Sequence, residues 1–370
     1  MKILAIDIGA GTEDILLFDD EKSSIENCVK MVLPSPCQVF ASKVRSMTHH
    51  RKDIFADGDT IGGGPLSYAI KQHIEAGFRV IMTENSAYTI RNNLEQVTEL
   101  GIEIENSRPI NFDGKTIFLE EVNIAKLHNF LNFFGETFLD IDFVAIAVQD
   151  HGIFPHNMTN RQFRIEKMKD ILEKQPKPEA FAFLENEVPI YYPRMKSAVN
   201  ASKRQLHGAK VLVMDTSLDA ILGCLMDPVV KNVDPILAVN VGNGHTMAAI
   251  VSNGEIIAVM EHHTRLLNPK KMEITLKNFA DGKLSNEQVF ADNGHGLFFL
   301  KKPPGFSQIQ KVIVTGPNRK ILAKTNMNVH FATPSGDVMM SGPIGLVEAT
   351  KRKNGVLQRK PLRLLHTVNT

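Results

Sequence analysis

The sequence predicts an α/β fold built from two related lobes, and three observations support this prediction. The first is an internal repeat, in which residues 3–11 (ILAIDIGAG) and 236–244 (ILAVNVGNG) share five identical positions and three similar ones. The second is an alternation of strand-like and helix-like segments between the two copies, which is typical of layered α/β proteins. The third is the length of 370 residues, which is more than one small hydrophobic core usually serves.

Each copy of the repeat predicts a strand, a glycine turn and a second strand. In the first copy the strands cover 3–8 and 15–18, and in the second copy they cover 236–241 and 247–251. Continuous runs of β-branched residues suit strands that are buried on both faces. Glycines in the connecting turns permit positive φ and let backbone N–H groups approach a phosphate without a Cβ in the way.

A polar side chain ends the first strand of each copy, Asp7 in one and Asn240 in the other. A carboxylate cannot bind phosphate directly, but it can hold Mg²⁺ through water while the turn holds the phosphate oxygens. The plainer alternatives are that Asp7 only caps its turn and that both copies are ordinary core hairpins. A structural turn, however, needs one glycine and not Gly-x-Gly with a polar residue two positions before it.

The rest of the chain divides into further strands and helices. Between the two copies, the expected strands are 79–82, 143–148 and 211–214, and the expected helices are 66–75, 87–100, 123–134, 161–173 and 218–226. After the second copy we expect a helix at 268–279, a strand at 309–314, a helix starting near Arg319 and a small-residue helix at 339–349. The predicted domains are a first lobe of residues 1–232, to which 338–370 return as a hinge helix and tail, and a smaller second lobe of 233–337.

Composition and charge exclude several classes of protein. Lys and Arg (42) nearly cancel Asp and Glu (41), so the net charge gives no reason to expect a nucleic-acid partner. The sequence contains no apolar run long enough to predict a membrane partner. It starts directly with a strand-like segment, so a cytoplasmic location is expected. Cys28, Cys37 and Cys224 are too irregularly spaced for a disulfide framework, a zinc knuckle or an iron–sulfur cluster. The tail 351–370 carries six basic residues and no acid, which is typical of a solvated end.

Five segments resemble those of the actin-like ATPase superfamily, which contains actin, sugar kinases and the ATPase domains of heat-shock chaperones. Residues 7–12 and 240–246 resemble its two phosphate loops, 215–223 and 341–349 its two connecting helices, and 312–318 its adenosine segment. The resemblance implies a duplicated ribonuclease-H-like fold with two lobes around a nucleotide cleft, and it implies ATP and Mg²⁺ as ligands. The residues that it assigns to the nucleotide, with Asp7 also supporting the metal, are Asp7, Gly9, Gly11, Thr12, Asn240, Gly242, Asn243, Gly244, His245, Thr246, Gly316, Pro317 and Asn318.

Two further details resemble the carbohydrate kinase branch of this superfamily. Residues 146–152 are similar to the Gln-x-His-Gly strand end that faces the sugar in those enzymes, which implies that Gln149 and His151 face a substrate. The segment from Asp219 to Gly223 is similar to the helix start that supplies their general base, which implies that role for Asp219. The alternative for Asp219 is an acid that complements the helix dipole. Asp150 is a second candidate base, because open α/β sheets bind their ligands at strand ends.

Some features depart from the pattern. Asn240 stands where many ATPases carry Asp, which argues against fast hydrolysis. Overall the chain resembles an archaeal group of this superfamily that is sometimes labelled a pyruvate formate-lyase activating protein, yet the cysteine cluster that radical chemistry needs is missing. The glycine-rich loop 57–65 is interpreted as a flexible connection or an anion site. No metal site is inferred from the spacing of His245, His262, His263 and His295.

Two functions are therefore carried forward. One is an ATP-dependent phosphotransferase that acts on a small hydroxylated metabolite. The other is a nucleotide-gated switch that acts on a protein partner, in the manner of a chaperone or an enzyme-reactivating factor. Asn240 and the small second lobe favour the switch, because slow hydrolysis suits a timer.

Overall fold

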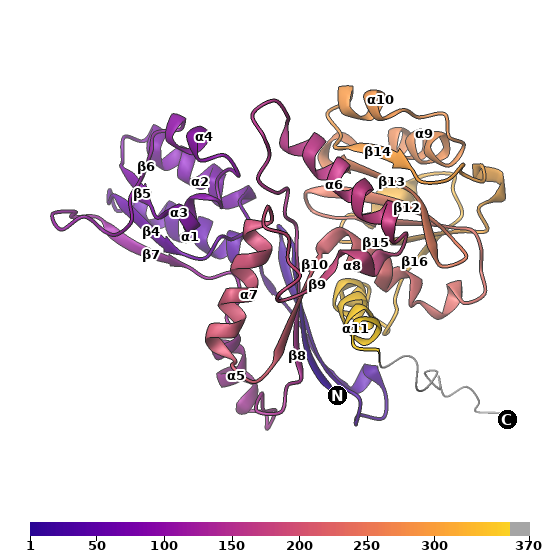
Figure 1. Ribbon diagram of the computed structural model, residues 1–370, viewed down its shortest axis with the longest axis horizontal. Helices are drawn as coiled ribbons and strands as arrows, with labels where there is room; N and C mark the ends of the chain where they lie inside the picture. Colours follow the sequence, from indigo (N-terminus) through magenta and orange to yellow (C-terminus); the bar gives the residue numbers. More distant parts are fainter. Residues whose placement is uncertain (356–370) are drawn as a thin grey trace.

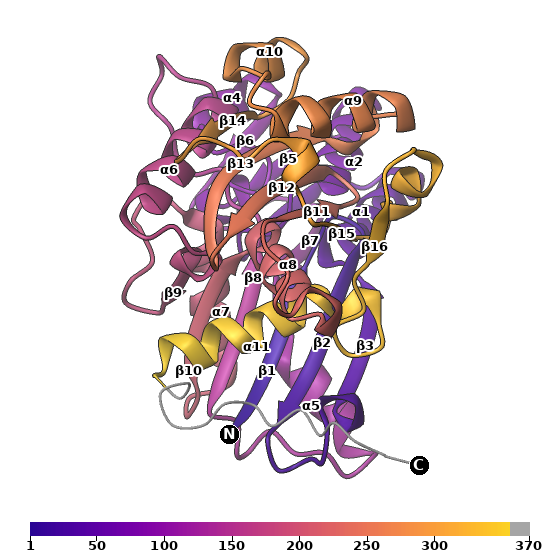
Figure 2. The same cartoon turned by 90° about the vertical axis from the view of Figure 1, so that its right-hand side faces the viewer.

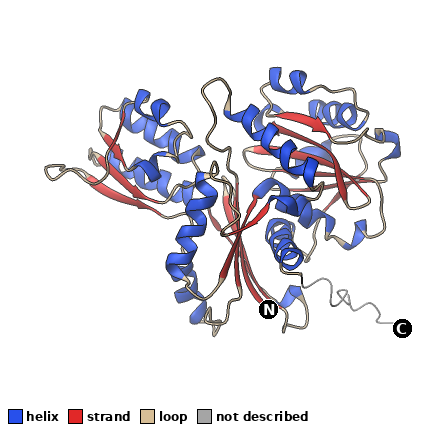
Figure 3. Ribbon diagram, viewed as in Figure 1, coloured by secondary structure: helices blue, strands red, loops and turns tan. Residues whose placement is uncertain are grey.

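The computed structural model describes residues 1–355 and contains three β-sheets, two of six strands and one of four. Figure 1 shows the four-stranded sheet on the left, the first six-stranded sheet in the middle and the second on the right, and Figure 3 shows the helices that cover them. This arrangement is the α/β class that the alternating sequence pattern predicts. The last part of the basic tail, 356–370, lies outside the described residues.

The first six-stranded sheet is built around the first copy of the repeat. Its central strand β1 pairs antiparallel with β2 on one side and parallel with β8 on the other. Beyond them, β3 pairs antiparallel with β2, β10 pairs parallel with β8, and β9 pairs antiparallel with β10. In spatial order the strands are β3 (Val29–Pro34), β2 (Thr12–Asp19), β1 (Lys2–Ile8), β8 (Phe143–Val148), β10 (Lys210–Asp215) and β9 (Ala182–Leu184).

The second six-stranded sheet is built in the same way around the second copy. Its central strand β11 pairs antiparallel with β12 and parallel with β15, and β12 pairs antiparallel with β13. The edges are β14, antiparallel to β13, and β16, parallel to β15. In spatial order the strands are β14 (Gly296–Phe299), β13 (Glu255–His263), β12 (His245–Ser252), β11 (Ile236–Val241), β15 (Lys311–Thr315) and β16 (Val329–Phe331).

Apart from one additional edge strand in each, β9 in the first and β14 in the second, the two sheets repeat one topology, three antiparallel strands followed by two parallel ones in the order 3-2-1-4-5. The two glycine turns repeat it in detail, because Gly9 N–H donates to Thr12 O at 2.9 Å and Gly242 N–H donates to His245 O at the same distance. This duplicated ribonuclease-H-like fold is the one that the sequence resemblance implies. The predicted domain boundary near residue 232 stays a prediction.

The four-stranded sheet is a separate unit that the sequence alternation did not distinguish. All its strand pairs are parallel, and it has its own hydrophobic core under helices α1 (Pro36–His49) and α2 (Gly64–Glu75). Periodicity identifies strands but not the sheet that each one joins, so the strand expected at 79–82 gave no sign of this insertion. The strands are β6 (Ile102–Ile104), β5 (Val80–Met82), β4 (Ile54–Gly58) and β7 (Lys115–Leu119).

Helices α8 (Thr216–Leu225) and α11 (Ser341–Lys353) pack against each other between the two six-stranded sheets. Figure 2 shows α11 crossing the first sheet in front of β1, with α8 above it. Their backbones touch where Gly223 and Gly345 lie, so a Cβ at either position would overlap a backbone oxygen of the other helix. Small residues at a helix crossing allow this close approach, as the sequence of 339–349 predicts.

The remaining helices mostly match the expected segments. Two expectations were wrong in detail. The helix expected at 87–100 is two short helices, α3 (Glu84–Ala87) and α4 (Leu94–Glu99), because Asn93 accepts hydrogen bonds from two backbone N–H groups and starts α4 anew. The helix expected from Arg319 is a 3₁₀ helix, Arg319–Lys324. The other α-helices are α5 (Ile124–Asn132), α6 (Asn160–Lys174), α7 (Pro193–Gln205), α9 (Pro269–Ala280) and α10 (Asn286–Ala291).

Short 3₁₀ helices connect several elements, at Ile25–Asn27, Pro178–Phe181, Pro228–Val230, Thr264–Leu266, Phe306–Gln308 and Val338–Met340. Among the described residues 1–355, every helix is too short or too polar to cross a bilayer.

Candidate functional site

The two glycine turns meet at the junction of the two six-stranded sheets. A Cβ added to Gly11 would overlap the side-chain amide of Asn243, so the turns are in direct contact. Residues that lie more than 230 positions apart in the chain are thus brought together by the duplicated fold. Two surface depressions of about 490 Å³ lie elsewhere, against residues of α1 and β7, and neither is lined by a turn residue.

Both turns contain backbone N–H groups that the described residues do not use. Within residues 1–355, the N–H groups of Ala10, Gly11, Asn243 and Gly244 donate no hydrogen bond to another residue. These residues are exposed or half-exposed, so their N–H groups are open to water or to an anion, and N–H groups at such glycine turns bind phosphate oxygens.

Three carboxyl groups crowd the end of β1. Asp7 accepts a hydrogen bond from Thr216 Oγ1 at 2.6 Å, and Asp14 stands opposite Asp7 in the strand register. Burial raises the pKa of Asp7 to about 7, and burial together with the Asp7 charge raises the pKa of Asp14 to about 8. Neighbouring carboxylates with raised pKa values are the groups that a divalent cation would stabilise in their ionised form.

Asp219 is the third of these carboxyl groups and lies in the first turn of α8. It is fully buried, and its Oδ2 has no hydrogen-bond partner among the described residues. Burial, followed by the charge of Asp7, raises the pKa of Asp219 well above its usual value. A buried carboxylate oxygen without a partner is costly, so it fits either a cation or a proton that arrives during a reaction.

The first turn of α11 closes over Asp7. A Cβ at Gly342 would overlap the Asp7 carboxylate, so only glycine lets the helix approach this strand end. Thr315 Oγ1 lies 2.9 Å from Ser341 Oγ and joins the end of β15 to the same helix start. The β1 strand end, α8 and α11 thus converge on one acidic point.

The segment after β15 lies against the second glycine turn. Gly316 has φ +93°, and a Cβ there would meet the Val241 backbone and the Asn240 side chain. Asn318 donates from its backbone N–H to Val241 O at 3.0 Å and from Nδ2 to Gly242 O at 3.1 Å. Pro317 and Asn318 are exposed next to the turn.

Thr12 and Thr246 hold corresponding places at the starts of β2 and β12, but their surroundings differ. Thr12 is half-buried, and its carbonyl closes the first turn. Thr246 is fully buried behind the second turn, where its hydroxyl lies 3.0 Å from Thr264 Oγ1. Thr264 Oγ1 in turn donates to Gly242 O at 2.9 Å, so this pair supports the turn from behind.

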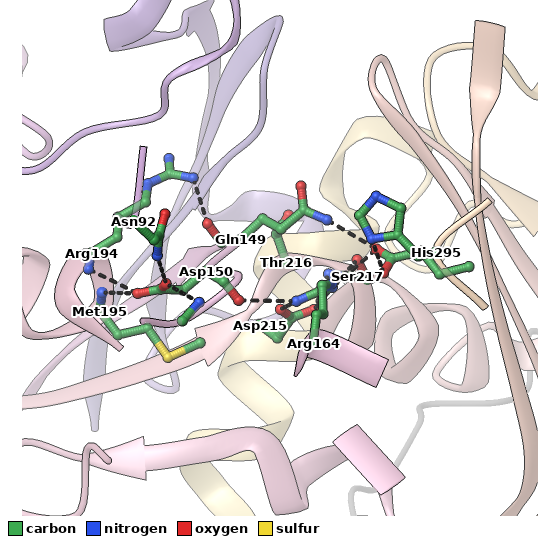
Figure 4. Close-up of polar contacts among 12 residues, drawn as sticks. Asn92, Gln149, Asp150, Arg164, Arg194, Met195, Asp215, Thr216, Ser217 and His295 are labelled. Atoms are coloured by element: carbon green, nitrogen blue, oxygen red, sulfur yellow. Dashed lines mark hydrogen bonds and ion pairs between the residues drawn. The ribbon is translucent and has the colours of Figure 1, made fainter. Parts of the chain in front are cut away.

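Gln149 and Asp150 follow the end of β8 and are engaged by other residues (Figure 4). Gln149 Nε2 donates to Glu261 Oε1 at 2.9 Å. The Asp150 carboxylate is buried and accepts from the backbone N–H groups of Gly152 at 2.8 Å, Arg194 at 2.8 Å and Met195 at 3.1 Å. These bonds favour a role in fixing the start of α7, and the assignment of Asp150 as a base stays a prediction.

The glycine-rich loop 57–65 lies near the same strand end. Gly62 N–H donates to Glu121 Oε2 at 3.0 Å, and a Cβ at Gly62 would lie 3.0 Å from Arg194 Nη2. The loop is therefore held by the buried Glu121 carboxylate, which also forms an ion pair with Arg194.

Arg164 was missed by the sequence analysis, because it is one charged residue in an ordinary helical pattern. It lies buried between two buried acids, with Nη1 2.7 Å from Asp215 Oδ2 and Nε 2.7 Å from Glu261 Oε2. Figure 4 shows Arg164 between Asp215 and the group that includes Gln149 and His295. This network joins α6, β10 and β13, and so ties the first sheet to the second.

Histidines gather next to this network, although their sequence spacing gave no sign of it. His151, His245 and His295 each place a ring nitrogen within 4.8 Å of the others. The ring of His263 also lies 4.8 Å, between centroids, from those of His245 and His295. Pairing of β12 with β13 sets His245 opposite His263, a relationship that no local spacing reveals. His262 is separate, since its Nε2 contacts Asp292 Oδ2 at 3.0 Å.

Three of these histidines, His151, His245 and His263, favour the neutral form because their pKa values are lowered. Burial is the main cause, and it lowers the pKa of His245 to about 3 and that of His263 to about 4. Burial also lowers the pKa of His151 well below its usual value, with a further contribution from His295. Neutral imidazoles are the form that binds metals.

Several solved structures are similar to this chain at low identity. A ROK hexokinase from Thermus thermophilus is 11% identical with a TM-score of 0.24, over 69% of this chain and 47% of its own, so this chain spans about half of the hexokinase. A PilM–PilN type IV pilus biogenesis complex is 10% identical with a TM-score of 0.41, over 94% of this chain and 98% of its own. An exopolyphosphatase from Cytophaga hutchinsonii is 10% identical with a TM-score of 0.30, over 85% and 66%.

These structural similarities carry no information about the activity of this chain. Among curated proteins, none matches. A family model does match residues 61–321, which is well over half of the chain. The chain therefore belongs to the family described as "Putative pyruvate format-lyase activating enzyme (DUF1786)".

Proposed function

We propose that this protein is an ATP-binding phosphotransferase or ATPase whose nucleotide phosphates are held where the two glycine turns meet. The observation that carries the proposal is the facing of two duplicated turns, Gly9–Gly11 and Gly242–Gly244, whose inner N–H groups have no partner within residues 1–355. Backbone N–H groups at such turns bind phosphate oxygens. Two cradles facing one another suit a chain of phosphates better than a single anion.

The acidic strand end supplies the place for a metal ion. Asp7 would hold Mg²⁺, and the unpartnered Asp219 Oδ2 and the high pKa of Asp14 fit a cation nearby. When bound, Mg²⁺ neutralises charge on the phosphate oxygens. The exposed segment Gly316 to Asn318, bonded to the second turn, would lie against the adenosine.

Asp219 is the residue we assign to proton transfer. Its buried carboxylate has one oxygen free, and its raised pKa suits a group that takes a proton from an attacking hydroxyl or water. The acceptor would then be a small hydroxylated metabolite near Gln149 and His151. Asp150 is less suited, because three backbone N–H groups already occupy its carboxylate.

Nucleotide entry requires the turns to separate, since Asn243 fills the space over Gly11. The close crossing of α8 and α11 between the two sheets is the natural axis for such a movement. Opening and closing of two lobes about packed helices is a common response to a ligand that contacts both.

The alternative is a nucleotide-gated switch that acts on a protein partner, and Asn240 is the observation that favours it. Asn240 replaces, at the end of β11, the carboxylate that Asp7 supplies at the end of β1. With one carboxylate instead of two, hydrolysis would be slow, and the bound nucleotide would act as a timer.

The family description does not lead to radical chemistry. An iron–sulfur cluster for that chemistry needs closely spaced cysteines. The three cysteines of this chain are each buried and lie apart, before β3, in α1 and in α8. We therefore derive no step from that description.

Nucleotide binding can be tested by calorimetry and thermal shift with ATP and ADP, with and without Mg²⁺. We expect ATP with Mg²⁺ to bind and to raise the unfolding midpoint as ligand rises. Asp7→Asn should weaken the Mg²⁺-dependent part of binding by about tenfold or more, which corresponds to about 1.4 kcal/mol. Asp113→Asn, an exposed acid in a loop, is the matched control. Failure of the intact protein to bind any adenine nucleotide would remove the proposal.

A second assay separates the two functions. Phosphate release and product formation are measured across a panel of hydroxylated metabolites. A phosphotransferase shows acceptor-dependent consumption of ATP that Asp219→Asn abolishes while nucleotide binding persists. A switch shows slow consumption that no metabolite accelerates, together with different partner binding in ATP and ADP.

A further inference from the structure

A group of histidines lies between the two six-stranded sheets, beside the second glycine turn, which the carbonyl of His245 closes. His151 follows β8 of the first sheet, His245 begins β12 of the second sheet, and His295 directly precedes β14 of the second sheet. Each offers one ring nitrogen within 4.8 Å of the other two. The ring centroids are 4.6 Å apart for His245 and His295 and 5.1 Å apart for His151 and His295.

The packing of these rings is poorly explained by core structure alone. His295 is 2% exposed, and its Nδ1 has no well-aligned hydrogen-bond partner among the described residues. Buried polar nitrogens normally have aligned partners, so hydrogen bonding within the described residues does not fully account for the position of this ring. The three imidazole rings lie in mutual contact, and one ring nitrogen of each lies within 4.8 Å of the other two, so the rings border a shared space.

A buried carboxylate stands behind the group. Glu261 Oε2 lies 3.1 Å from His295 Nδ1, a close polar approach that is not aligned as a hydrogen bond. Glu261 is itself held by Arg164 and by Gln149 Nε2 at 2.9 Å. Histidine ligands of metal ions usually direct their second nitrogen at a carboxylate or carbonyl, which orients the ring and increases its basicity. His295 Nδ1 faces Glu261, which leaves Nε2 for an ion.

We propose that His151, His245 and His295 form a binding site for a divalent transition metal of the Zn²⁺ class, which bridges the two halves of the molecule. Three nitrogen ligands suit Zn²⁺ and its first-row neighbours, whereas Mg²⁺ and Ca²⁺ prefer oxygen. Zinc lies about 2.0–2.1 Å from each histidine nitrogen, so ring nitrogens that are now up to 4.8 Å apart would move closer together when an ion binds. A tetrahedral ion with three histidines keeps a position for one further ligand, and His263 borders the same space.

This site is distinct from the proposed Mg²⁺ at Asp7, and it does not depend on the proposed function. One ligand comes from the first sheet and two come from the second, so a bound ion would hold the sheets in the closed arrangement described here. Metal binding should therefore stabilise the folded protein in proportion to the free metal concentration.

The test uses the full chain without an affinity tag, stripped with a chelator and then titrated with Zn²⁺ and with Co²⁺. We expect one ion per chain, a visible Co²⁺ spectrum typical of tetrahedral nitrogen coordination, and a higher unfolding midpoint with Zn²⁺. His151→Asn, His245→Asn and His295→Asn should each weaken binding by about a hundredfold or more, and Glu261→Gln by about ten- to a hundredfold. His156→Asn, an exposed histidine outside the group, should bind like the unchanged protein.

Circular dichroism of each metal-free variant checks that it is folded. His151 lies half-buried in a loop, so His151→Asn keeps the test usable if the change at buried His295 impairs folding. The proposal is overturned if the stripped protein binds neither ion, or if His156→Asn weakens binding as much as the three others. It is also overturned if His151→Asn retains full affinity, because the ion would then not link the two sheets.

Discussion

Gly223 of α8 and Ser341 of α11 approach so closely that a Cβ on Gly223 would overlap the Ser341 carbonyl oxygen. The two helices that cross between the sheets thus touch backbone to backbone at this point. The neighbouring contact, Gly345 against the Asp219 carbonyl, is equally close and places the crossing beside the candidate base. Rigid packing at the crossing and the position of Asp219 are therefore coupled.

Gly223→Ala should destabilise the protein strongly, by about 3 kcal/mol, because the added methyl meets backbone that cannot rotate away. Gly208→Ala is the matched control, since nothing lies within 4 Å of a Cβ there and its φ is not positive. That change should be neutral or stabilise by about 0.4–1 kcal/mol through the unfolded chain. Urea unfolding of both variants measures the difference, and equal stabilities would contradict the close crossing.

Gly11→Ala should weaken nucleotide binding, because the new methyl overlaps the Asn243 side chain and keeps the two turns from closing around a bound nucleotide. We expect a loss of about tenfold, or about 1.4 kcal/mol. Gly11→Ala should cost less affinity in the Asn243→Ala background than in the unchanged protein, because the shortened side chain no longer meets the new methyl. Calorimetric titration of the three variants gives the coupling between the turns. If the losses of affinity from Gly11→Ala and Asn243→Ala simply add in the double variant, the two turns do not act together on one ligand.

Asp14→Asn should change how stability depends on pH. The pKa of Asp14 is raised from 3.8 to about 8 by burial and by the charge of Asp7, so the folded state keeps a proton that the unfolded state loses. Its contribution to stability is therefore complete below about pH 4 and is lost as the pH rises towards 8. Thermal unfolding should show the variant and the unchanged protein converging only below about pH 4, where Asp14 is protonated in both the folded and the unfolded state. The variant should be the more stable of the two near about pH 9.

Asp113→Asn provides the comparison for this pH series, because Asp113 is exposed. Its stability curve should run parallel to that of the unchanged protein at every pH. A parallel curve for Asp14→Asn as well would show that Asp14 titrates alike in the folded and unfolded states.

Arg164→Ala should destabilise the fold by about 3–5 kcal/mol, because it leaves Asp215 and Glu261 buried without their shared cation. Lys169→Ala on the same helix removes only a surface pair with Glu173 and should cost less than about 1 kcal/mol. Denaturant unfolding measures both. A small effect at Arg164 would mean that water reaches the network and replaces the lost charge.

Much of the fold could be predicted because its signals are local. The repeat around Gly9–Gly11 and Gly242–Gly244 identifies both hairpins, and the structure gives them the same turn hydrogen bond. The small residues of 339–349 predict a closely packed helix, which the contacts of Gly342 and Gly345 confirm. The four-stranded insertion could not be predicted, since strand periodicity does not say which sheet a strand joins.

The site was predictable only where residues follow one another along the chain. Asp7 and Asn240 stand at the ends of the repeated strands and could be identified from the repeat. Arg164 and Glu261 gave no signal, because a buried charge looks like a surface charge until its partners are known. Asp150 looked like a free acid at a strand end, and only the structure shows the backbone groups that bind it.

By itself the sequence determined the α/β class, the duplication and the two glycine turns, because hydrophobic periodicity and glycine placement are properties of short segments. Tertiary structure alone decided that Gly11 meets Asn243, that Arg164 lies between two acids, and that His151, His245 and His295 share one space. The physical reason is that strand pairing and sheet packing bring together residues whose separation along the chain carries no trace of their distance in space.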